Sequence, residues 1–246
     1  MAVTRERFRR YVRAMNAISG RTRQAVLDLW PRLDHSSMDA LREDLLRYVP
    51  PLVAKMGQVS AAVSARFYDD VRTAGRARGD YRATTSDPGL TRVERALLYA
   101  TGSQMAYSDV PAMVAGAAAT NVLEYGRQTI AENTAYDPFA SGYRSVPSGD
   151  NPCPFCVIKS LNTWTYHMYA GERLTDEVDG DAWHDNCSCQ LIPEVGDAPA
   201  WVDDGADRDW YEAGRQRAMD DAGKTMADPL TASEVMAGMR KVRAES

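Results

Sequence analysis

The sequence of 246 residues lacks any apolar run that approaches the roughly 20 residues of a membrane-spanning helix. Its first residues, MAVTRERFRRYV, are charged from the start and lack the apolar segment of a secretory signal. We therefore expect no membrane partner and synthesis in the cytoplasm of the cell that makes the protein. In that reducing compartment, clustered cysteines indicate a metal site before a disulfide.

The common catalytic motifs are missing as well. The sequence has no H-E-x-x-H, no Walker A loop, no G-x-G-x-x-G and no G-x-S-x-G. Histidine occurs only at His35, His167 and His184, which leaves few candidates for acid–base chemistry. A zinc deaminase would also need H-x-E before its P-C-x-x-C segment, and His35 is followed by two serines. We expect a protein that is not an enzyme and has no small-molecule substrate.

Lysine is scarce, since it supplies only four of the 29 basic residues, and the charge is unevenly spread. Residues 1–32 contain eight arginines against two acidic residues, whereas the tail from residue 194 onward is acidic. Arg5, Arg9 and Arg13 recur every four residues on one predicted helix face, with Arg10 beside them. This face predicts contact with nucleic acid or an acidic protein surface, although a solvated helix face gives the same pattern.

Apolar residues recur with the 3.6-residue helical period throughout the first half of the chain. The stripe in the first helix contains Phe8, Tyr11 and Met15, and it is an apolar anchor for a partner if the protein's own core does not cover it. Capping boxes, prolines and a glycine predict the further helix boundaries, and the paired prolines are expected to stop or kink their helix. These boundaries are Ser36, Pro50–Pro51, Gly75, Thr91 with Glu94, and Pro111.

The pattern changes after residue 136. Residues 137–152 are rich in Pro, Gly, Ser and Asp and predict turns, and weak strand signals follow at 163–169 and 187–193. Two short helices are expected near the end, the second capped by Thr231 and Glu234. The sequence therefore predicts a mainly α fold in three parts. They are a helical domain at 1–136, a small zinc-stapled α+β module at 137–195, and an acidic linker with C-terminal helices at 196–246.

All four cysteines lie in that module, in the pattern C-x2-C followed by H-x2-C-x-C. A C-x-x-C pair places two thiolates on one tight turn, which is half of a tetrahedral zinc site. Cys153, Cys156 and Cys187 form the core set, and either His184 or Cys189 completes it. We predict a structural zinc because four protein ligands close the site. Reduced thiols packed as apolar residues, a disulfide pair, or a dithiol redox site are the alternatives. A thioredoxin-like site should open a helix, which this context does not predict.

This arrangement resembles the MuF-like minor head proteins of tailed bacteriophages, in the form carried by phages of actinobacteria. In that family a helix ending in Asp precedes an arginine, a C-x-F-C segment with a hydroxyl-containing stretch, and an H-x2-C-x-C finish. The resemblance covers about residues 50–195. The matching positions are Asp137, Arg144, Cys153, Phe155, Cys156, Ser160, Tyr166, His184, Cys187 and Cys189.

The resemblance implies a virion structural protein at the portal vertex or the inner head surface, needed for head morphogenesis or DNA delivery. Its partners would be the portal or the major capsid protein, and packaged DNA is a further candidate. Two other classes stay open from the residues alone. One is a nucleic-acid-binding zinc protein that uses the arginine-rich N-terminal helix, and the other is a thiol redox or zinc enzyme.

Overall fold

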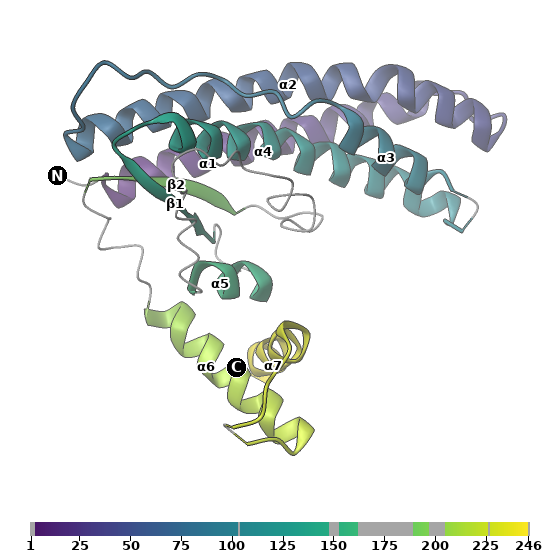
Figure 1. Cartoon of the computed structure of the whole chain (residues 1–246). Coiled ribbons are helices and arrows are strands. Elements are labelled where there is room, and N and C mark those ends of the chain that lie inside the picture. Colours follow the sequence, from purple (N-terminus) through teal and green to yellow (C-terminus); the bar gives the residue numbers. More distant parts are fainter. Residues whose placement is uncertain are drawn as a thin grey trace.

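The computed structural model describes residues 3–102, 104–147, 153–161, 189–196, 205–225 and 227–245. In this part of the chain the fold is mainly helical, with one small antiparallel sheet, as the sequence predicts (Figure 1). The helices and strands, in chain order, are α1 Arg5–Leu29, α2 Met38–Gly75, α3 Thr91–Ala100, α4 Val110–Tyr136, β1 Ala140–Val146, α5 Pro154–Leu161, β2 Gln190–Val195, α6 Gly205–Ala222 and α7 Ala232–Glu245. Two short 3-10 turns, Trp30–Arg32 and Tyr107–Asp109, precede α2 and α4.

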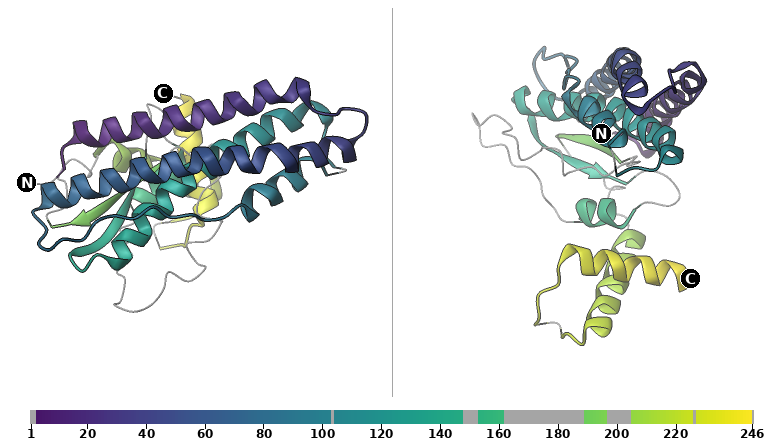
Figure 2. Two further views of the ribbon diagram at one scale, coloured as in Figure 1. Left: turned by 90° about the horizontal axis from the view of Figure 1, so that it is seen from above. Right: turned by 90° about the vertical axis from the view of Figure 1, so that its right-hand side faces the viewer.

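Three long helices, α1, α2 and α4, lie side by side and form the main body (Figures 1 and 2). The predicted stripe of α1 is buried against the other two, with Tyr11 stacked on Phe67 at a centroid distance of 4.2 Å. Helix α4 is buried on nearly every side because α1, α2, α3 and the sheet all pack on it. Its many alanines and small polar residues allow the surrounding helices to approach closely.

Glycine marks the points of closest approach within this body. A Cβ atom added at Gly57 of α2 would lie 2.5 Å from the ring of Tyr125 on α4. A Cβ added at Gly126 of α4 would overlap Met15 of α1 and lie 2.6 Å from the Ser64 hydroxyl of α2. The three helices therefore pack through positions that exclude any larger side chain.

The sheet pairs β1 with β2 and lies against α4 (Figure 1). Its register aligns Tyr143 with Pro193 and Val146 with Gln190. Arg144 of β1 reaches Glu194 of β2, with its Nε at 3.1 Å and its Nη2 at 3.0 Å from the same carboxylate oxygen. The ion pair at the family position Arg144 thus joins strands that are about 50 residues apart in sequence.

Helices α6 and α7 form a hairpin that packs on α5 (Figure 1). The two helices cross where a Cβ added at Gly238 would meet the backbone of Gly214 and Ala218. The indole Nε1 of Trp210 donates to the Met239 carbonyl at 2.9 Å. A second apolar cluster joins the hairpin to α5. It consists of Val157, Val235 and Met239, with Ile158, Leu161, Trp210, Tyr211 and Leu230 packed against it.

Several predicted boundaries are confirmed. Helix α4 has Pro111 in its first turn, and α2 ends at Gly75. Thr231 and Glu234 form the expected capping box of α7, because the Thr231 N–H donates to the Glu234 carboxylate at 2.7 Å and the Glu234 N–H donates back to Thr231 Oγ1 at 3.2 Å.

Other boundaries are wrong. Helix α2 does not stop at Pro50 and Pro51, because Val49 and Val53 on either side are buried on the same face and their packing outweighs the lost hydrogen bonds. The alternative, a kink at the two prolines, stays a prediction. Its N-cap is Ser37 rather than Ser36, since the Ser37 hydroxyl accepts from the Ala40 N–H. Helix α3 begins at Thr91 without a side-chain cap.

Two elements of the cysteine module were not predicted. Residues 140–146, expected as turns, form β1, because a strand partner about 50 residues later supplies hydrogen bonds that local composition does not reveal. The C-x-x-C segment opens α5. Of the two strand signals, the one at 187–193 overlaps β2, and the one at 163–169 lies outside the described residues.

Candidate functional site

The cysteine pair of the candidate metal centre lies at the start of α5. Cys153 immediately precedes this helix, and its carbonyl accepts the Val157 N–H at 3.1 Å. The Cys156 N–H donates to Cys153 Sγ at 3.3 Å, and the Cys153 thiol donates to Cys156 Sγ at 3.0 Å. The structure therefore brings both predicted thiols together, at the helix end that favours negative charge. Two thiols so placed can bind a soft metal ion or be oxidised to a disulfide.

Cys189, the third described cysteine, directly precedes β2 and is buried. It belongs to the same apolar cluster as Cys153 and Cys156. Its carbonyl accepts from Nε of Arg127 at 3.0 Å, and Arg127 is itself buried in α4. The main helical body thus fixes the backbone at Cys189.

The other two predicted ligands, His184 and Cys187, lie outside the described residues, as does Tyr166 of the family pattern. Within the described ranges, no three His, Cys, Asp or Glu side chains are grouped as a metal site. The described donors therefore fit half of a tetrahedral site, formed by Cys153 and Cys156, and zinc itself stays a prediction.

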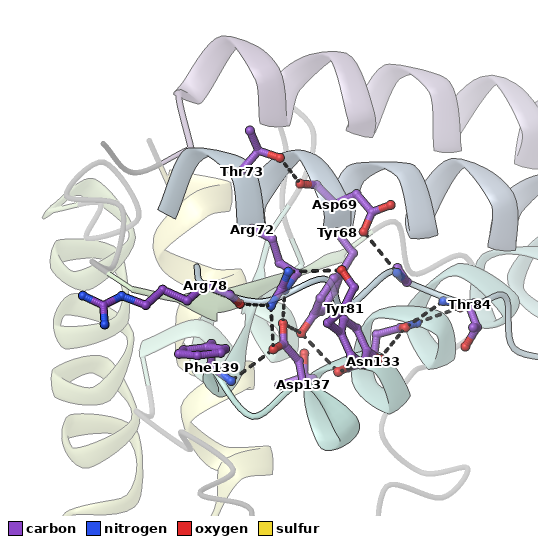
Figure 3. A network of polar contacts seen from close by, with 12 residues as sticks. Tyr68, Asp69, Arg72, Thr73, Arg78, Tyr81, Thr84, Asn133, Asp137 and Phe139 are labelled. Carbon is purple, nitrogen blue, oxygen red and sulfur yellow. Dashed lines mark hydrogen bonds and ion pairs between the residues drawn. The ribbon is translucent and has the colours of Figure 1, made fainter. Parts of the chain in front are cut away.

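A buried ion pair holds the junction between α4 and β1 (Figure 3). Asp137, at the C-cap of α4, accepts from Nε of Arg72 at 2.5 Å and from its Nη2 at 3.2 Å. The Asp137 side chain is 0% exposed and that of Arg72 is 7% exposed. The Tyr68 hydroxyl and the Phe139 N–H also donate to this carboxylate. The family position Asp137 is therefore a structural anchor for the strand that follows it.

The same network fixes the connection between α2 and α3 (Figure 3). Arg72 donates to the carbonyls of Arg78 and Tyr81 at 3.0 and 3.1 Å. The Asn133 side chain bonds to both the N–H and the carbonyl of Thr84, and it accepts from the Tyr81 hydroxyl at 2.8 Å. Burial and the nearby Asp137 charge raise the pKa of Tyr81 to about 12. A carboxylate and an arginine thus position a long segment that has no regular structure.

A second buried polar group links the helices to the sheet. The Tyr11 hydroxyl lies 2.9 Å from Ser64 Oγ and donates to the Gln190 side chain at 3.4 Å. Burial raises the pKa of Tyr11 to about 12, although the Ser64 hydrogen bond and the positive charge of Arg127 oppose this shift. These contacts tie α1 and α2 to the first residue of β2.

The four predicted contact arginines, Arg5, Arg9, Arg10 and Arg13, are all exposed on α1. Arg13 pairs with Glu6 at 3.0 Å on the same surface. The apolar stripe opposite them is covered by α2 and α4, because Phe8, Tyr11 and Met15 are buried. The condition under which this stripe could anchor a partner is therefore not met, whereas the charged face of α1 is exposed.

Sequence reasoning missed the buried arginines Arg72 and Arg127. Both occupy positions that continue a buried stripe of their helix: Arg72 follows Tyr68 by four residues, and Arg127 follows Leu123 by four. A charged residue at an apolar position of the helical pattern was the available signal, since such a residue needs a buried partner.

Together these features define a protein whose buried ionisable groups serve to fix its helices and sheet to one another. The chain belongs to the VG15 protein family, a bacteriophage-related family, because the family model matches residues 2–218. The match includes the helical body, the cysteine module and most of α6. No curated protein and no solved structure matches the chain significantly. Among the described residues, no helix is long and apolar enough to cross a membrane.

Proposed function

We propose that this protein is a structural component of the phage particle, a minor head protein at the portal vertex or the inner capsid surface. The observation that carries the proposal is its membership of a phage-related family along nearly the whole chain. The resemblance of the cysteine module to MuF-like minor head proteins supplies the finer role. The protein would act by contact in head assembly or DNA delivery, with the portal or the major capsid protein as partner, and not as an enzyme.

The architecture supports a role in binding a partner protein. The long helices are joined by buried polar groups such as Arg72 with Asp137 and Tyr11 with Ser64. Such networks fix the relative positions of surfaces that would be presented to a partner. A mass-spectrometric inventory of purified particles tests the proposal: we expect this chain at low copy number. Its absence from particles, while it is present in infected cells, would contradict the role.

We also propose that the cysteine module holds one structural zinc. Cys153 and Cys156 would supply two ligands, Cys187 a third, and His184 or Cys189 the fourth. The close thiols at the start of α5 support this assignment. Zinc would hold the C-x-x-C turn to the segment before β2, so its binding should be coupled to folding of the module.

Metal analysis of protein purified under reducing conditions should find about one zinc per chain. Cys153→Ser should lose the metal and unfold the module while the helices of the main body stay formed. The matched control is Ser160→Ala, in the same helix, whose hydroxyl donates to the Val157 carbonyl of that helix. Wild-type protein without metal, or with a disulfide between Cys153 and Cys156 in the particle, would refute the zinc proposal.

One observation favours the redox alternative. The C-x-x-C pair opens a helix, as a dithiol redox site does, although the sequence context did not predict this. Reduction of a disulfide substrate at a rate abolished by Cys153→Ser would replace the structural assignment with this one.

A further inference from the structure

The outer face of α2 carries a shallow depression to which the proposed function assigns no role. It is lined by Lys55, Gln58, Val59, Ala62, Val63 and Arg66. Val59 is 46% exposed, whereas the opposite side of the same helix is buried. The depression thus presents apolar side chains to solvent between basic ones.

The spacing of these residues suits a helical partner. Lys55, Val59, Ala62 and Arg66 follow one another at intervals of three and four residues, so they share one face of α2. The eleven steps along the helix from Lys55 to Arg66 span about 16 Å, or three turns, at 1.5 Å per residue. The face is therefore a short apolar strip with a positive charge at each end.

Helix α1 extends the positive charge at one end of the strip. Tyr11 bonds to Ser64, and the Phe8 ring lies 6.1 Å from that of Phe67. Residues 8–11 of α1 therefore run alongside residues 64–67 of α2. Arg9 and Arg10, both exposed, lie at the level of Arg66.

These charges are not neutralised by any residue that the structure describes. In the described part of the chain, Arg9, Arg10, Lys55 and Arg66 have neither an ion pair nor a hydrogen-bond partner for their side chains. Three basic residues of the C-terminal hairpin differ from them, because their charges are paired with acidic neighbours. The pairs are Arg217 with Glu245, Lys224 with Glu234, and Lys241 with Asp221. The strip and its flanks form a local positive field on a chain whose net charge is -5.

We propose that this face docks an acidic amphipathic helix of about three turns, supplied by a partner protein. The helix would lay apolar side chains on Val59, Ala62 and Val63, and its carboxylates would meet Lys55 at one end and Arg66 and Arg10 at the other. A DNA backbone would use the charges and gain nothing from the exposed valines. The inference rests on the proposed function only for the identity of the partner as a head component.

Two peptides test the chemistry of the face without reference to the particle. One is an amphipathic helical peptide of 18 residues with a leucine face flanked by glutamates. The other has the same sequence with lysines in place of the glutamates. Fluorescence anisotropy with the full-length protein should show tighter binding of the glutamate peptide. The net negative charge of the protein favours the opposite order, so this preference would report the local face.

Charge reversal supplies the decisive variant. Lys55→Glu combined with Arg66→Glu should invert the preference, so that the lysine peptide binds tighter, by roughly fivefold to tenfold for two exposed pairs. Arg82→Glu combined with Arg95→Glu changes the same charge at exposed residues elsewhere and should leave the preference unchanged. Val59→Asn should weaken binding of the glutamate peptide by roughly threefold to fivefold, since it removes apolar contact without adding charge. All of these positions are exposed, so the variants should keep the helical circular dichroism of the wild type.

Three outcomes would overturn the proposal. The first is equal binding of the two peptides. The second is that Arg82→Glu with Arg95→Glu changes the preference between the two peptides as much as Lys55→Glu with Arg66→Glu does. The third is strongly salt-dependent binding of a 24-base-pair DNA duplex that exceeds peptide binding and that Val59→Asn leaves unchanged, which would assign the face to nucleic acid. None of these results depends on whether the chain is found in particles, so failure here and failure of the head-protein role are separate findings.

Discussion

Arg72→Met is the substitution from which the structure predicts the largest single loss of stability. Methionine keeps much of the side-chain volume and removes the guanidinium, so the Asp137 carboxylate loses both of its charged contacts. Among the described residues it keeps the Tyr68 hydroxyl and the Phe139 N–H as donors, in a site where its side chain is 0% exposed. The carbonyls of Arg78 and Tyr81 lose a donor as well.

A buried charge that loses its partner costs about 3–5 kcal/mol, and that is the expected loss in the free energy of unfolding. The assay is urea unfolding followed by far-UV circular dichroism. Arg13→Met is the matched control, because Arg13 pairs with Glu6 on the surface and the two side chains are 63% and 60% exposed. That variant should lie within about 0.5 kcal/mol of the wild type.

A double-mutant cycle separates the ion pair from simple loss of packing. Asp137→Asn removes the charge of the partner, so Arg72→Met combined with Asp137→Asn should cost at least about 2 kcal/mol less than the sum of the two single variants. Additive costs, or a loss below about 1 kcal/mol for Arg72→Met alone, would refute the view that this pair is desolvated and anchors the junction of α4 and β1.

Three further predictions follow from other parts of the structure. Burial raises the pKa of Tyr11 to about 12 from an ordinary value of about 10. The neutral hydroxyl therefore contributes fully to the free energy of unfolding below about pH 10, and this contribution is lost as the pH rises to about 12. Tyr11→Phe should reduce this alkaline loss of stability in urea titrations. Gly126→Val should destabilise the main body by about 2–4 kcal/mol, because its side chain would overlap Met15 and Ser64, and calorimetry should show a lower Tm. Gly238→Val should separate α6 from α7, since its Cβ would meet the backbone of α6, and faster amide hydrogen exchange confined to these two helices would show it. An unchanged Tm for Gly126→Val, or uniform exchange in Gly238→Val, would contradict the packing described.

The helical body could be predicted from the sequence because its signals are local. The stripe of Phe8, Tyr11 and Met15 and the stripe of α4 repeat with the helical period, and each is buried where the period places it. The stop expected at Pro50 and Pro51 is wrong because packing around the two residues outweighs their local effect. A proline signal is local, and burial on both sides of it decides whether the helix continues.

The cysteine module was less predictable because its structure depends on contacts far apart in sequence. Strand β1 exists through pairing with residues 190–195, and Asp137 is fixed by Arg72, which is 65 positions earlier. The cysteines alone indicated a site, and they did not indicate that the site would open a helix. The charged face of α1 was visible in the sequence, but its continuation through Lys55 and Arg66 of α2 required the antiparallel packing of the two helices.

The position of α5 gives the cysteine pair a structural consequence beyond its own turn. Cys156 faces the core of the main body, whereas Val157, the next residue, faces the C-terminal hairpin. Adjacent residues of one short helix therefore pack in two separate apolar clusters. Only a single orientation of α5 buries both side chains in their clusters. Whatever holds the C-x-x-C turn, whether zinc or packing alone, also fixes where α6 and α7 lie relative to the long helices. This coupling is why a loss of Cys153 should move the hairpin as well as unfold the module.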